Sequence, residues 1–171
     1  ALYLLDKNKN GAREIASSLS DALEKIQRCK SCRMLTTNDQ CIVCEDETRD
    51  SQCICVVESP SDLLAIESTG GYKGKYYVLM GRLSPLDNLG PDELGIPQLL
   101  ETIKRDSIKE IILALSSTVE GDATAIFIKD HVENIKVSRI SYGIPIGGEL
   151  EYVDSNTIAR SIISRVEIND D

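Results

Sequence analysis

Residues 53–62 read CICVVESPSD, and this stretch decides the fold class. Its first five residues form a continuous apolar run, which is typical of a strand buried on both faces of a sheet. Glu58 follows at once, and Pro60 then stands where a helix accepts proline in its first turn. A strand that passes directly into a helix is the repeating unit of a parallel α/β sheet.

The same alternation continues along the chain. Apolar runs at 76–80 and 111–115 predict two more strands, and residues 137–141 predict a weaker fourth. Helical patterns follow the strands at 60–68, 97–106, 122–133 and 156–164. We therefore expect an α/β fold with a mainly parallel sheet and helices on both of its faces.

An amphipathic helix is predicted ahead of the sheet, over residues 11–27. Ile15, Leu19 and Leu23 recur there at helical spacing, and Gly11 marks the expected start. The apolar opening at residues 1–5 has neither an initiator methionine nor a capping signal, so we expect an N-terminal truncation.

The composition is that of a globular protein with one main core. The chain has 171 residues, of which 42% are hydrophobic and 27% are charged. No apolar run reaches the length of a membrane span, and no export signal opens the chain. These features predict a soluble, cytoplasmic protein without a membrane partner.

Charge is divided unevenly around the formal net value of −9. Residues 1–35 contain seven basic and four acidic side chains, whereas residues 36–171 contain twelve basic and twenty-four acidic ones. An acidic body repels phosphate backbones, so contact with nucleic acid should come from the basic front segment. The acidic body favours a basic partner surface, although acidic faces also serve solubility alone.

Four cysteines are arranged as two Cys-x-x-Cys pairs, Cys29 with Cys32 and Cys41 with Cys44, eight residues apart. Two such pairs form the tetrahedral sulfur cage that zinc prefers in closed structural sites. Disulfides and a thioredoxin-like redox pair are the alternatives, but the pairs lie in a polar insert without an export signal. We predict one structural zinc ion, with no open position for catalysis.

The remaining cysteines and the single histidine are expected to be structural. Cys53 and Cys55 alternate within a predicted strand and should be buried as small hydrophobic residues. His131 stands late in a helix with no second ligand nearby, so we expect a partly solvated helix position.

Acidic residues follow two of the predicted strands. Glu58 comes directly after 53–57, and Glu120 and Asp122 come after 111–115. The carboxyl ends of parallel strands meet at one edge of the sheet, where ligand crevices form. These acids could therefore approach one another, or they could simply complement helix dipoles.

This pattern resembles the Toprim domain shared by topoisomerases, primases and some repair proteins. The resemblance is carried by the predicted strand 53–57, Glu58, the helix that follows it, and residues 111–122. Those enzymes place an Asp-x-Asp pair where this chain has Ser116 and Thr118. Phosphoryl transfer through bound magnesium needs several carboxylates on the ion, and neutral hydroxyls leave too little charge to hold it.

A closer resemblance, to the RecR family of bacterial recombination mediators, covers nearly the whole chain. The cysteine module carries it, together with residues 56–62, 79–87, 118–121 and 143–154. Family members commonly have Asn-Pro where Ser116-Ser117 stand here. The family's N-terminal helix-hairpin-helix element is represented only by residues 1–5, so we expect weak or absent DNA binding by this chain.

The RecR resemblance implies a non-enzymatic role: working with RecO and RecF to load RecA onto gapped single-stranded DNA, in a ring-like oligomer. It also divides the chain into a residual helical region (1–27), a four-cysteine zinc finger (28–50), a Toprim domain (51–146) and a C-terminal part (147–171). Residues 147–152 are Walker B-like in the family. No phosphate loop accompanies them, so we expect a turn that docks the C-terminal tail rather than ATP hydrolysis.

Two other functions are consistent with parts of this pattern. A magnesium-dependent Toprim nuclease or primase-like enzyme would use Glu58, Glu120 and Asp122, and a zinc-ribbon accessory protein would share only the metal site. In the mediator interpretation, the three acids lie on one edge without a metal and present a negative patch to a basic partner, RecO by resemblance.

Overall fold

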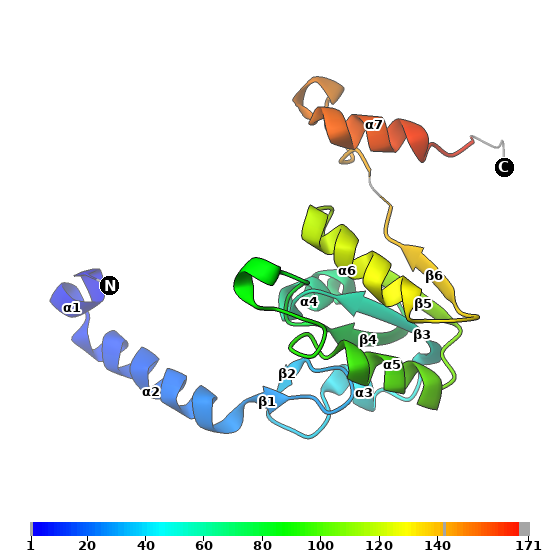
Figure 1. Cartoon of the computed structure of the whole chain (residues 1–171). Helices are drawn as coiled ribbons and strands as arrows, with labels where there is room; N and C mark the ends of the chain where they lie inside the picture. The colour runs from blue at the N-terminus through cyan, green and yellow to red at the C-terminus, as the bar shows by residue number, and fades with distance from the viewer. Residues whose placement is uncertain (1, 142, 168–171) are drawn as a thin grey trace.

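The computed structural model describes residues 2–141 and 143–167, and its centre is a four-stranded sheet (Figure 1). The strands are β3 (Asp50–Val57), β4 (Gly74–Val78), β5 (Glu110–Ala114) and β6 (Lys136–Arg139). Their order is β4-β3-β5-β6, and every pairing is parallel. The predicted α/β class with a parallel sheet is confirmed.

Helices cover both faces of this sheet. On one face, Leu63 of α4 (Pro60–Ser68) packs with Cys55 and Val57 of β3. On the other face, α5 (Ile96–Arg105) and α6 (Val119–Asp130) pack over the alternate β3 residues, including Val56. Because both faces of β3 are buried over residues 54–57, residues 53–57 form a continuous apolar run rather than an alternating one.

The segment before the sheet folds into a small module. It consists of β1 (Gln27–Arg28), antiparallel to β2 (Leu35–Thr36), and the short helix α3 (Ile42–Glu45). This module lies along β4, the strand at one edge of the sheet: the Val78 N–H donates a hydrogen bond to the Cys32 carbonyl at 2.8 Å. Lys75 donates to the Cys44 and Asp46 carbonyls, so the backbone of the module is fixed to the sheet at two places.

Arg49, at the junction of module and sheet, is the centre of a buried ion pair. Its side chain is 8% exposed and pairs with the Glu67 carboxylate of α4. The guanidinium also donates to the Gly74 carbonyl at 3.2 Å and lies 5.9 Å from the centre of the Tyr76 ring. Hydrogen bonding from Arg49 lowers the pKa of the Glu67 carboxyl below its usual value.

Two helix starts differ from the sequence prediction because a side-chain cap decides them. Helix α2 (Lys9–Lys25) begins after Asn8, whose side chain accepts from the Gly11 N–H at 2.9 Å, so the predicted start at Gly11 is wrong. Helix α6 begins at Val119, three residues earlier than predicted, because Thr118 caps it by accepting from the Gly121 N–H.

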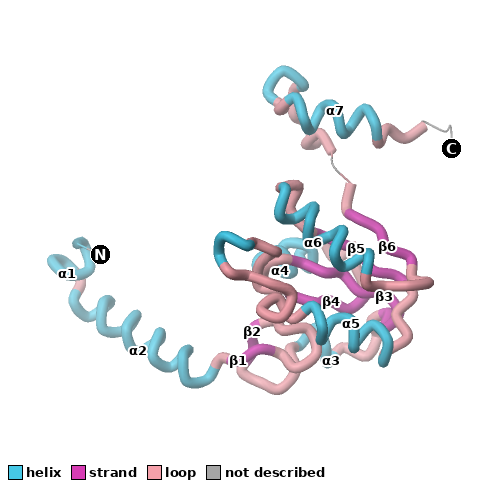
Figure 2. Tube along the Cα trace, viewed as in Figure 1, coloured by secondary structure: helices cyan, strands magenta, loops and turns pink. Residues whose placement is uncertain are grey.

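The ends of the chain extend from the body (Figures 1 and 2). At the amino end, α1 (Leu2–Lys7) and α2 contain no buried residue, and Leu19 and Leu23 of the predicted amphipathic face are exposed. At the carboxyl end are the short η2 (Leu150–Tyr152) and α7 (Ser155–Ile163). No helix among residues 2–141 and 143–167 is both long enough and apolar enough to span a bilayer.

Candidate functional site

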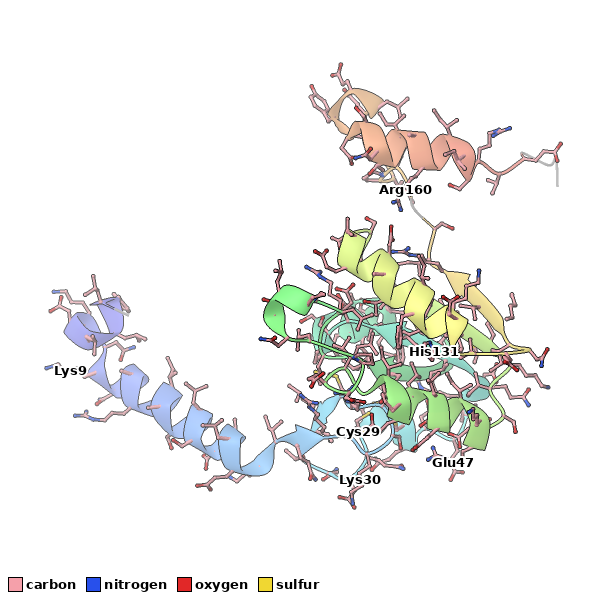
Figure 3. All side chains as sticks on the ribbon, in the orientation of Figure 1. Lys9, Cys29, Lys30, Glu47, His131 and Arg160 are labelled. Atoms are coloured by element: carbon pink, nitrogen blue, oxygen red, sulfur yellow. The ribbon has the colours of Figure 1, made fainter. Side chains whose placement is uncertain are left out.

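The first candidate site is a metal centre made by Cys29, Cys32, Cys41 and Cys44. The ends of the β1-β2 turn supply the first pair, while α3 and its N-cap supply the second. The four Sγ atoms all lie within 4.8 Å of one another, and the first three cysteines are at most 4% exposed. Figure 3 shows Cys29 where the module meets the body. The predicted pairs therefore converge on one point.

The donor set fits a tetrahedral metal ion. Four sulfurs about 2.3 Å from a central ion lie about 3.8 Å apart, and the Cys32 and Cys41 sulfurs are 3.5 Å apart. Backbone N–H groups of Met34 and Cys41 point at Cys32 and Cys29 sulfurs, both at 3.4 Å, and favour the thiolate form. Since four protein ligands complete the coordination, such an ion would be structural.

The thiols of this cage perturb one another strongly. Hydrogen bonding from Cys32 lowers the pKa of Cys41 to about 2, while the same contact raises the pKa of Cys32. The lowered pKa of Cys41 favours its thiolate, which is the form of cysteine that binds a metal ion.

The second candidate site is Glu58, at the carboxyl end of β3. Its side chain is 15% exposed. The backbone N–H and the hydroxyl of Ser116 both donate to Glu58 Oε1 at 2.7 Å. Arg82 Nη1 lies 3.4 Å from Glu58 Oε2 and 3.4 Å from Ser116 Oγ. The carboxylate is therefore held by a cation and two donors of the chain itself.

This arrangement does not fit a catalytic magnesium ion. Ser116 and Thr118 occupy the positions where Toprim enzymes carry two carboxylates, and their hydroxyls lie 3.1 Å apart, hydrogen-bonded to each other. The guanidinium of Arg82 already places a positive charge beside the Glu58 carboxylate. A divalent cation would have to displace an arginine and would meet one carboxylate instead of three.

Gly121 keeps the loop after β5 close to α6. A Cβ at this position would lie 2.2 Å from the Ser116 carbonyl oxygen, so no other residue fits without moving the backbone. The close approach positions Ser116 for its two hydrogen bonds to Glu58.

Asp122, in the first turn of α6, has arginine partners. Arg139 of β6 lies 2.5 Å from one of its oxygens, and Arg160 of α7 lies 3.4 Å from the other. Hydrogen bonding from Arg139 is the main cause that lowers the pKa of this carboxyl. Figure 3 shows Arg160 between α7 and the body, so Asp122 links the C-terminal helix to the sheet.

The three predicted acids share an edge but not an environment. Glu58 and Asp122, two of the acids expected to form a negative patch, are both ion-paired with arginines. Glu120 instead lines an apolar groove beside α6, and no ion pair among the described residues includes it. Of these three acids, Glu120 is therefore the one that no ion pair within the described residues neutralises.

Sequence reasoning missed the three arginines. Arg82 follows β4 as Glu58 follows β3, so its place at the same edge of the sheet was a usable signal. Arg139 ends β6 and could have been placed near α6 in the same way. Arg160 carried no such signal, since nothing in the pattern fixed where α7 would lie.

The other reactive side chains are structural. Cys55 is buried as predicted, and burial raises its pKa to about 12. Cys53 is only half-buried, beside the Tyr72 hydroxyl. His131 caps the end of α6, exposed and stacked on Phe127, which agrees with the predicted solvated helix position.

The parallel sheet, Glu58 at the end of β3 and the loop after β5 define a Toprim protein, and the Toprim domain model matches residues 52–141. The model described as RecR, C-terminal, matches residues 143–166. The recombination protein RecR of Francisella philomiragia is 50% identical over 98% of this chain and 84% of its own length. That of Acinetobacter baylyi is 46% identical over 98% of this chain and 86% of its own length. The chain belongs to the RecR family of recombination proteins.

Proposed function

We propose that this protein is a non-enzymatic mediator of recombinational DNA repair in the cytoplasm, which works with RecO and RecF to load RecA on gapped single-stranded DNA. Its relatives, named recombination protein RecR, support the recombination role. The observation that carries the non-enzymatic part is the contact of Glu58 with Arg82 and Ser116. A Toprim edge whose carboxylate is already engaged is suited to holding a structure together rather than to metal catalysis.

The metal of the four-cysteine cage is proposed to be one zinc ion per chain. Four thiolates in a closed, buried cage favour zinc among the common divalent ions, because it accepts tetrahedral sulfur coordination without a geometric penalty. The domain boundaries remain a prediction, with parts at 1–27, 28–50, 51–146 and 147–171. The ring-like oligomer and weak DNA contact are also predictions.

The mediator role is tested by RecA loading. RecA is mixed with gapped DNA whose single strand is covered by a single-strand binding protein, and its DNA-dependent ATP hydrolysis is followed. The chain is expected to shorten the lag only when RecO, or RecO with RecF, is present. An unchanged lag under all combinations would reject the mediator proposal.

We predict no magnesium-dependent or manganese-dependent cleavage or synthesis of nucleic acid, because Ser116 and Thr118 supply no carboxylate and Arg82 competes for Glu58. The assay uses single-stranded, gapped and primed DNA with a Toprim enzyme as positive control. Robust turnover that Glu58→Gln abolishes would instead support the Toprim nuclease or primase-like alternative.

We propose that Glu58, Glu120 and Asp122 belong to the RecO-binding edge. Glu120 provides the test, because no ion pair within the described residues includes it and its replacement therefore breaks none of them. Glu120→Ala is expected to weaken RecO binding about two- to fivefold, as for one exposed charge pair, and high salt should weaken binding by the parent. Titration calorimetry measures both effects. Glu101→Ala on α5 is the matched control, and equal affinities for both variants and the parent would exclude Glu120 from the interface.

A further inference from the structure

An apolar groove lies between the loop of residues 83–93 and the first turns of α6. Its volume is about 760 Å³. Figure 1 shows the loop, with the short η1 helix (Pro85–Asp87), beside the start of α6. The apolar lining comes from both walls and includes Leu83, Leu89, Pro91, Val119, Ala123 and Phe127.

A hydrogen bond at a buried hydroxyl joins the two walls. The Leu83 N–H donates to the hydroxyl of Thr124 at 2.9 Å, and this hydroxyl donates to the Glu120 carbonyl at 2.6 Å. Thr124 is completely buried. The loop is closed on itself by an antiparallel bridge between Ser84 and Leu89. The groove is therefore preformed, so an occupant need not organise it.

Exposed apolar side chains flank the groove. Val119, the first residue of α6 and part of the lining, is 83% exposed, and Leu86, which follows the lining residue Pro85 in the chain, is 95% exposed. Single exposed apolar residues are common, but Val119 belongs to a concave apolar surface. Such continuity of exposed apolar surface marks an interaction site.

The charge of the groove indicates what binds there. The charged residues that line it, Glu93 and Glu120, are both acidic, and neither is in an ion pair within the described part of the chain. The exposed apolar ends of this chain do not complement them: residues 1–26 have equal numbers of basic and acidic side chains, and residues 140–167 have more acidic than basic ones. Residues 27–35 are basic, but they belong to the folded four-cysteine module, where Arg33 already donates to the Glu93 and Leu94 carbonyls. Charge complementarity therefore favours another protein over a second copy.

We propose that this groove binds a segment of a partner protein that presents apolar side chains flanked by lysine or arginine. The inference rests on the proposed function in that a partner protein supplies the segment, and it adds the surface and the chemistry of recognition. The apolar side chains enter between the loop and α6, while the flanking cations approach Glu93 and Glu120 at the rim.

Two short amphipathic peptides, one of leucine and lysine and one of leucine and glutamate, are the probes, with binding followed by fluorescence anisotropy. The parent is expected to bind only the lysine peptide. Ala123→Arg fills the groove from its exposed wall and should weaken binding by about tenfold or more, whereas Val119→Ser should weaken it about threefold. Ile126 lies on the same helix, is 59% exposed and does not line the groove, so Ile126→Arg and Ile126→Ser are the matched controls.

Equal weakening by Ala123→Arg and Ile126→Arg would mean that the lysine peptide responds to charge alone, and would overturn the proposal. Equal binding of both peptides would do the same. If sedimentation shows that the parent self-associates and Ala123→Arg does not, a second copy occupies the groove and the partner assignment is wrong.

Titrating the same variants with full-length RecO and RecF separates this proposal from the proposed function. If either protein binds the parent and Ala123→Arg equally well, the groove is not its docking site, although the mediator role stands. If the lysine peptide binds specifically in the groove while neither protein binds the parent, the mediator partnership is wrong and the groove assignment stands.

Discussion

Replacing Cys41 by serine is expected to abolish binding of the proposed zinc ion and to unfold residues 28–50. The module has almost no apolar interior apart from the cysteines themselves, with Met34 and Val43 beside them. Its folding therefore depends on the metal, and a structural zinc site supplies about 10–16 kcal/mol of apparent binding free energy at neutral pH. A serine hydroxyl is a poor replacement for a thiolate ligand in a four-sulfur cage.

Zinc content by mass spectrometry of the digested protein measures the first effect, and limited proteolysis measures the second. The parent should contain one zinc per chain and resist cleavage within 28–50, while Cys41→Ser should lose both properties. Cys53→Ser is the control, since this half-buried cysteine lies outside the cage. Equal zinc content in Cys41→Ser and the parent would reject the metal assignment.

Replacing Arg49 by methionine should lower the free energy of unfolding by about 3 kcal/mol. Methionine keeps much of the volume of the side chain, but the carboxylate of Glu67 then stays partly buried without its cation. Breaking a buried ion pair on one side costs several kcal/mol because the remaining charge is desolvated and unpaired. Urea unfolding at pH 7 measures the difference.

The effect of Arg49→Met should depend on pH in a defined direction. In the parent, Arg49 holds the pKa of Glu67 below its usual value of 4.5, so this carboxyl stabilises the fold fully above that value. The contribution disappears as the pH falls through the lowered pKa, and the gap between parent and variant should narrow there. Arg105→Met, which breaks an exposed pair with Asp106, should cost less than about 1 kcal/mol. A constant gap from pH 7 down to pH 3 would contradict the role of this pair.

The sheet could be predicted from sequence because its strands are buried on both faces. A strand such as 53–57 must then be apolar throughout, and a run this short and rich in β-branched residues favours a strand over a helix. The cysteine cage could be predicted because metal geometry restricts ligand spacing. Helix starts were less predictable, since hydrophobic periodicity does not show that α2 begins at Lys9, after the cap Asn8, rather than at Gly11.

The carboxylate edge shows the limit of such reasoning. The pattern placed Glu58 at a sheet edge, but a pattern does not show which cation of a neighbouring loop reaches it, so Arg82 was missed. The groove beside Glu120 was missed for a related reason. It is formed by tertiary packing of an irregular loop on a helix, and Thr124 joins the two across 41 positions of sequence.

The hydrogen bond between Val78 and Cys32 has a consequence for solubility. Strand β4 is an outer strand, and its free side would offer unpaired backbone groups next to Tyr76, Tyr77 and Val78. Exposed strands of this kind add to other chains and begin aggregation. The metal module covers part of that side. Chelators or oxidants that remove the metal should therefore do more than unfold the small module. They should also expose the free edge of β4 and favour precipitation of the whole protein.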